Sequence, residues 1–275
     1  MEEKLHLQGI SVKRPYLFSI FIVVTISVVN LVSAGLGTAL PQLPPTLLEF
    51  MAELVLALLA TVLLTALRSW RNAGFHALPS LKDVRLYWVP VLPLLPVLIA
   101  VVTGMSRMRV DEVAFYLVLA CLVGFAEEVY FRGLMLRALV SLGLWRAAVI
   151  SSVLFGVMHL QNLLFGADLA GTLLQVAYAA AMGFGFAAVT LRTGVIWPLV
   201  VIHALIDFAG FATSGETVMG DVSAADVAVY GLYILVFVTY GLFMMRSGRR
   251  LQAQDQFELH QFSHVPQRAT PRRQP

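Results

Sequence analysis

Charge is what this sequence has least of. Asp, Glu, Lys and Arg make up only 13% of its 275 residues, while 59% are hydrophobic and the mean hydropathy is +0.82. A soluble domain carries about 25% charged residues. The shortage excludes an ordinary soluble domain and predicts a membrane protein of the all-α class, a bundle of transmembrane helices.

Cysteine is almost absent as well. The chain has one, Cys121, inside an apolar run. One cysteine excludes an intramolecular disulfide framework and a Cys-x-x-Cys metal motif. We interpret Cys121 as a small buried apolar residue. The net charge of +3 indicates no nucleic-acid partner, because the basic residues gather at the ends of apolar runs.

Long apolar runs are what the sequence does have. A membrane span needs about 20 such residues at 1.5 Å each. We predict about eight spans, at roughly 16–38, 46–67, 86–104, 113–140, 146–165, 170–191, 195–212 and 226–245. The domain organisation follows in four parts: N-terminal spans in 1–112, a core in 113–212, a last span in 213–245 and a polar tail in 246–275 that we predict to be disordered.

Lysine and arginine near the span ends predict the orientation. The first apolar run is too long for a signal peptide, so we interpret it as the first span. Placing both termini in the cytoplasm puts most basic residues inside. One outer loop departs from the pattern with Arg107 and Arg109, which Asp111 and Glu112 offset. The sequence predicts an integral protein of the bacterial cytoplasmic membrane, with the lipid bilayer as a partner.

Ionisable residues inside these spans are costly, at about 2.5–3.5 kcal/mol for a charge at a helix centre. The stretch "FAEEVYFRG" holds Glu127, Glu128 and Arg132. Glu128 and Arg132 are four apart and share a helix face, so they are predicted to pair. Glu127 is turned about 100° away and is left for another role.

Two further segments add polar residues at a similar depth. "FGVMH" ends in His159, and "HALID" carries His203 and Asp207 four apart on one face. Counted from the cytoplasmic ends of their spans, Glu127, His159 and His203 lie roughly 10–20 Å deep. We therefore predict one polar cavity, formed by the fourth, fifth and seventh spans and reached from the cytoplasmic side.

Other small or polar residues in these spans indicate packing. Ala179, Gly183 and Ala187 are spaced by four and predict a helix-packing face. Ser151 and Ser152 are interpreted as cap residues at the start of the fifth span. No serine or cysteine stands beside a base in the three polar segments, which weighs against covalent catalysis.

Two chemistries fit the polar residues. A carboxylate and imidazoles activate a water directly, or they do so through a zinc ion held by Glu127, His159 and His203. His203, oriented by a hydrogen bond to Asp207, would instead donate to an oxyanion. Purely structural roles remain an alternative for each residue: an ion pair, a packed histidine and an interhelical hydrogen bond.

The three segments together resemble the motifs of the CPBP or Abi family, which includes the type II CAAX prenyl endopeptidases. The family pattern is EExxxR, then FxxxH, then HxxxN or HxxxD, and the resemblance covers about residues 113–212. It implies an eight-span intramembrane endopeptidase in which Glu127 and His159 position and activate the water. His203 and Asp207 would stabilise the tetrahedral intermediate or help to hold the water. The resemblance implies supporting roles for three further residues: Glu128, Arg132 and Phe155.

The predicted function is therefore cleavage of a membrane-associated peptide or protein near the cytoplasmic face. Asp207 stands where the CAAX enzymes have asparagine, so this position brings a charge and no amide donor. Two alternatives stay open. One is a non-catalytic immunity or scaffold protein of the same fold, and the other is an ion or proton transporter, since intramembrane Glu, His and Asp also form relays.

Overall fold

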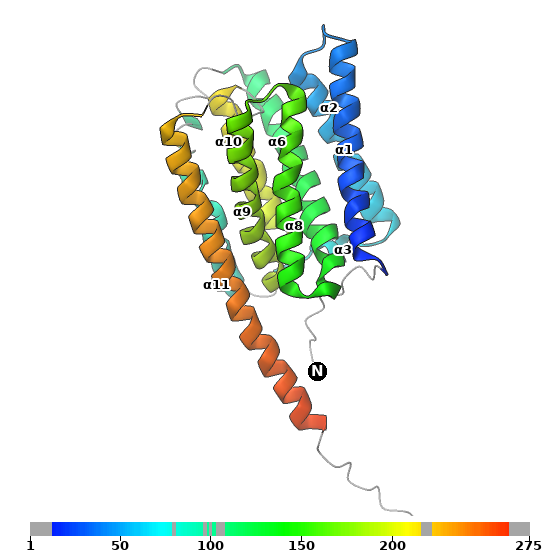
Figure 1. Cartoon of the computed structure of the whole chain (residues 1–275), viewed down its shortest axis with the longest axis vertical. Helices are drawn as coiled ribbons and strands as arrows, with labels where there is room; N and C mark the ends of the chain where they lie inside the picture. Colours follow the sequence, from blue (N-terminus) through cyan, green and yellow to red (C-terminus); the bar gives the residue numbers. More distant parts are fainter. Residues whose placement is uncertain are drawn as a thin grey trace, which may run out of the picture.

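The computed structural model describes residues 13–78, 81–95, 98, 101–102, 108–215 and 222–263, with side chains to Arg246. Its regular structure within these ranges is entirely helical. The long helices run up and down between two ends of one bundle (Figure 1). The predicted fold class, an all-α polytopic helical bundle, is confirmed.

Seven helical stretches in the described residues are long and apolar enough to cross a membrane. They are α1 (Pro15–Ala39), α2 (Pro45–Ala66), α6 (Val110–Glu128) with its continuation to Leu142, α8 (Leu144–Met158) with η4 (His159–Phe165), α9 (Leu169–Thr193), α10 (Trp197–Ser214) and α11 (Ala224–Ser263). Each lies within a few residues of a predicted span. The predicted span 86–104 is described at 86–95, 98 and 101–102, where η1 (Leu81–Tyr87) leads into the short α4 (Trp88–Val91), and it is not among the seven stretches.

The helix ends follow local chemistry. Pro15 and Pro45 open α1 and α2 in their first turns, where a missing N–H costs nothing. Asp168 caps α9 by accepting a hydrogen bond from the Gly171 N–H at 2.8 Å. Gly194 ends α9 with a left-handed φ of 72°, which allows the tight turn into α10.

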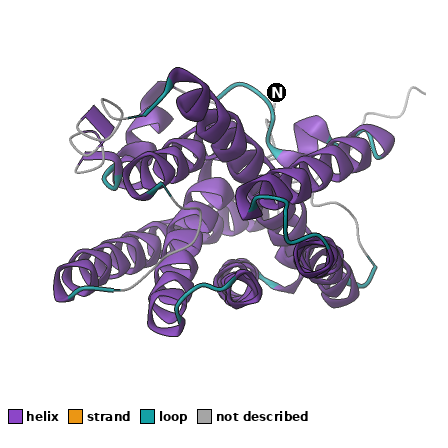
Figure 2. Ribbon diagram, turned by 90° about the horizontal axis from the view of Figure 1, so that it is seen from above, coloured by secondary structure: helices purple, strands orange, loops and turns teal. Residues whose placement is uncertain are grey.

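The bundle has a clear order of neighbours. The central α9 packs between α8 and α11, α6 packs along α10, and α2 joins α1 to α6. The splayed arrangement is visible from above in Figure 2. We call the end at which α1 begins and toward which α11 runs the lower end, and the other the upper end, as drawn in Figure 1.

Two expectations differ from the structure. α11 continues as a helix to Ser263, whereas the sequence predicts a disordered tail from Arg246. Eleven of the 18 residues at 246–263 are Arg, Leu, Gln, Ala or Glu, which favour helices, and no proline interrupts them. The second difference is Cys121, which is exposed on α6 rather than buried.

Candidate active site

The first motif sits where an α-helix changes into a π-helix. α6 ends at Glu128, and η2 (Val129–Met135) follows as a fully buried π-helical turn. The carbonyl of Phe131 accepts the Leu136 N–H and, at 3.0 Å, the Ser151 hydroxyl. The prediction that Ser151 caps a helix start is wrong, because Ser151 is buried within α8 and binds this neighbouring helix. Such π-helical turns are frequent at functional sites.

Glu128 joins the first motif to the third. Its Oε1 lies 3.0 Å from Nη1 of Arg132, which confirms the predicted pair. The same Oε1 lies 2.9 Å from Nδ1 of His203, which donates to it from α10. Exposed fractions are 0% for Glu128, 1% for Arg132 and 3% for His203. The buried carboxylate of Glu128 is therefore paired with the buried cation of Arg132, as the low dielectric of a protein interior requires.

Aromatic rings complete the surroundings of Arg132. Its guanidinium carbon lies 4.1 Å from the centre of the Phe155 ring and 5.6 Å from that of Phe186. Such cation–π contacts stabilise a desolvated cation. A Cβ on Gly183 would stand 2.9 Å from Nη2 of Arg132. The small residues of α9 therefore do form a packing face, and at Gly183 that face makes room for the guanidinium.

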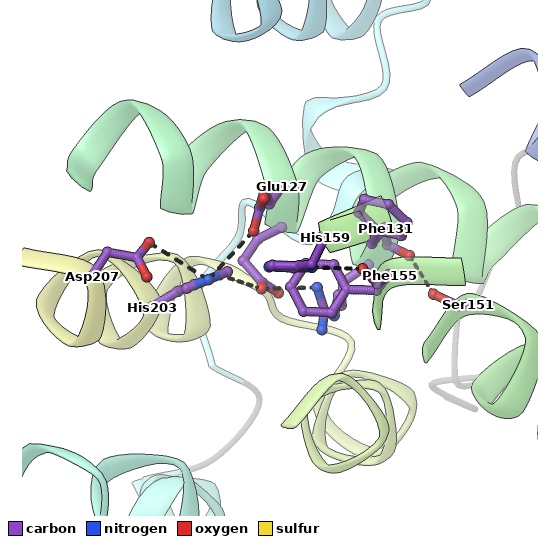
Figure 3. A network of polar contacts seen from close by, with 9 residues as sticks. Glu127, Phe131, Ser151, Phe155, His159, His203 and Asp207 are labelled. Atoms are coloured by element: carbon purple, nitrogen blue, oxygen red, sulfur yellow. Dashed lines mark hydrogen bonds and ion pairs between the residues drawn. The ribbon is translucent and has the colours of Figure 1, made fainter. Parts of the chain in front are cut away.

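The remaining nitrogen of His203 faces two carboxylates. Its Nε2 lies 3.5 Å from Oε2 of Glu127 and 3.6 Å from Oδ2 of Asp207 (Figure 3). These are ion-pair distances, longer than a direct hydrogen bond. The expectation that Asp207 orients His203 by a hydrogen bond is therefore wrong. Glu128 orients the ring, and Asp207 adds charge beside it.

His159 is held in one tautomer. Its Nδ1 lies 2.9 Å from the carbonyl oxygen of Phe155, which can only accept, so Nδ1 carries the proton. In the neutral ring the lone pair then sits on Nε2. The ring of Phe155 packs edge-on against His159, with centroids 5.1 Å apart. Figure 3 shows Glu127, His159 and His203 converging from α6, the start of η4 and α10.

Glu127 and His159 both line one cavity. The space measures about 830 Å³ including its mouth, and His203 and Asp207 also line it. The prediction that three distant segments share one polar cavity is confirmed. The remaining lining residues come from helices on both sides: Ile26, Asn30, Glu49, Glu53, Leu56, Val123, Ala126, Tyr130, Phe131, Met158, Asn162, Gln175 and Phe211.

Sequence reasoning missed the contribution of α2. Glu49 and Glu53 both line the cavity, and Oε2 of Glu53 is buried with no hydrogen-bond partner in the described part of the chain. The signal was available, since these are two acids four apart inside the second apolar run. They lay outside the three motifs, so the spacing alone did not connect them to Glu127.

The donor arrangement can be compared with the needs of a zinc ion. Such an ion requires three protein ligands around one point. Within the ranges that the structure describes, no three His, Cys, Asp or Glu side chains are placed to share an ion. Both nitrogens of His203 already face carboxylates. The predicted set of Glu127, His159 and His203 does not fit zinc as arranged.

Comparison with known proteins agrees with the motifs. Residues 109–209 match the family model described as type II CAAX prenyl endopeptidase Rce1-like. This stretch contains all seven residues of the three motifs and confirms the resemblance seen in the sequence. It supports a CAAX-type protease in general, and with the apolar helices it indicates an integral membrane protein. No curated protein matches the chain.

Proposed function

We propose that this protein is an intramembrane endopeptidase in which Glu127 activates the water that attacks the peptide bond. One contrast between adjacent glutamates carries the proposal. The Glu128 side chain is fully buried and bound by Arg132 and His203, whereas that of Glu127 is 26% exposed on the cavity wall. A general base needs this kind of access to water and substrate.

His159 is the second group at the water. With its proton fixed on Nδ1, its Nε2 accepts a hydrogen bond from one O–H of the water. The other O–H donates to Glu127, which takes that proton as the oxygen attacks the carbonyl carbon. The match to a CAAX-type protease family over residues 109–209 supports this assignment.

His203 stabilises the charge that develops on the carbonyl oxygen. In its imidazolium form, Nδ1–H donates to Glu128 and Nε2–H points toward Glu127 and Asp207, where it can donate to the oxyanion. The tetrahedral intermediate then collapses. The C–N bond breaks, Glu127 passes its proton to the leaving amine, and a carboxylic acid and a free amine remain.

Comparing peptide termini in membranes tests the proposal. Wild type, Glu127→Gln and Glu112→Gln are expressed at matched levels, and new termini are identified by mass spectrometry. Glu112 lies on the same helix, near the upper end and outside the cavity lining, so it controls for the loss of a carboxylate. Termini should appear with wild type and Glu112→Gln, and fall at least a hundredfold with Glu127→Gln. Unchanged termini in a folded Glu127→Gln protein would sink the proposal.

A chelator test follows from the arrangement of donors. Purified wild type should cleave a substrate found in this way at an unchanged rate after exhaustive treatment with a zinc chelator. Loss of cleavage that added Zn²⁺ restores would show that the donors rearrange around an ion, and it would replace this mechanism with a metal-assisted one.

A further inference from the structure

The cavity extends from the middle of the bundle into its upper part. Several of its lining residues stand within two turns of the upper helix ends: Glu49 near the start of α2, Asn162 near the end of η4, Gln175 near the start of α9 and Phe211 near the end of α10. Asn162 donates to Gln175 at 2.9 Å, which ties two of these elements together there. The cavity therefore extends from the reactive residues toward the upper end.

The lower half is closed below the same residues. In five of the lining helical segments, one turn further down, stands a side chain that is at most 1% exposed. These floor residues, one each from α1, α2, η2, α8 and α10, are Ile22, Ala60, Leu134, Phe155 and Leu199. Glu128 and Arg132 are buried as well, and the Arg132 guanidinium packs on the ring of Phe155. Within the described ranges, no lining residue of the cavity comes from below this layer.

Charge identifies which membrane face the upper end meets. Basic residues of the described chain gather at the lower end: Lys13, Arg14, Arg68, Arg71, Lys82, Arg85, Arg137, Arg146, Arg192 and Arg246. At the upper end Arg109 is paired with Asp111 at 2.9 Å. Four further acidic residues stand near upper helix ends: Glu49, Glu112, Asp168 and Asp226. Positively charged ends face the cytoplasm, so the lower end is the cytoplasmic one.

We infer that the cavity opens to the outer, non-cytoplasmic face of the membrane. The sequence predicted that the termini lie in the cytoplasm and that the cavity is reached from the cytoplasm. Both cannot hold in this structure, because the end at which α1 begins is the end that the floor closes. The packed floor decides between them in favour of outer access. Given the proposed function, the substrate class is a peptide segment exposed at or beyond the outer face, such as part of an exported or membrane-anchored protein.

Cysteine labelling tests the side of access without any substrate. The only native cysteine is removed as Cys121→Ser, and one cysteine is added at a time to the full chain. Gln175→Cys reports the cavity. Gln42→Cys, exposed between α1 and α2, marks the upper end, and Asn72→Cys, exposed on α3 (Trp70–Ala73), marks the lower end. Intact and permeabilised cells receive a membrane-impermeant maleimide.

Gln175→Cys should label in intact cells together with Gln42→Cys, while Asn72→Cys labels only after permeabilisation. Labelling of Gln175→Cys only together with Asn72→Cys would overturn the inference, and so would no labelling of Gln175→Cys in either condition. If Gln42→Cys and Gln175→Cys label only after permeabilisation, the orientation is reversed and outer access fails. None of these results depends on Glu127, so they separate the side of access from the proposed reaction.

Discussion

Glu127 and Glu128 are neighbours in sequence but belong to two different regions. Glu128 lies in the floor, where its Oε1 contacts Arg132 four residues on and His203 on α10. Glu127 lies on the cavity wall, where carboxylates from three helices face open space. Two adjacent glutamates therefore have different surroundings. Glu128 helps to fix the orientation of His203, whereas the carboxylate of Glu127 is accessible from the cavity.

Breaking the floor should have the largest effect on stability. Arg132→Met removes the cation and leaves Glu128 buried beside His203 alone, which costs about 3–5 kcal/mol of unfolding free energy. Chemical unfolding of the purified protein in detergent measures this cost. Adding Glu128→Gln should recover part of it, because the double variant leaves no unpaired carboxylate. A double variant no more stable than Arg132→Met would show that the pair is not the cause.

Crowding the floor should have a smaller effect. Gly183→Ala places a Cβ 2.9 Å from Nη2 of Arg132 and 3.1 Å from Cδ1 of Phe155, so the guanidinium must shift. We expect a loss of about 1–3 kcal/mol in unfolding free energy. Gly210→Ala on α10 is the matched control, since nothing lies within 4 Å of its added Cβ. Equal losses for both would contradict a packing role specific to Gly183.

The sequence predicted the frame of both regions. Hydropathy predicted seven of the eight proposed spans to within a few residues, and helical spacing predicted the Glu128–Arg132 pair. It also singled out Glu127, His159 and His203, because ionisable residues in apolar runs stand out. These inferences needed only periodicity and the cost of burying charge.

What escaped the sequence depends on contacts between helices. The hydrogen bond of His203 goes to Glu128, 75 positions away, and not to Asp207 on its own helix face. Ser151 supports a π-helical carbonyl that no spacing rule predicts. The side from which the cavity is reached also cannot be inferred from the sequence. The position of a residue along its helix gives its distance from each end of the helix, but not which end of the bundle is closed by packed side chains.

A change on the wall that spares Glu127 should have the smallest effect. Glu53 lies partly buried on α2, and its Oε2 has no hydrogen-bond partner among the described residues, so Glu53→Gln breaks no such contact at that atom. It also lowers the negative charge that the cavity wall carries. We expect the unfolding free energy to stay the same or rise by up to about 1 kcal/mol. The rate of cleavage should change by less than about tenfold, compared with a hundredfold or more for Glu127→Gln. Unfolding and cleavage measurements made in parallel on the two variants check this. A hundredfold loss of cleavage with Glu53→Gln in a folded protein would contradict the prediction and show that Glu53 takes part in catalysis.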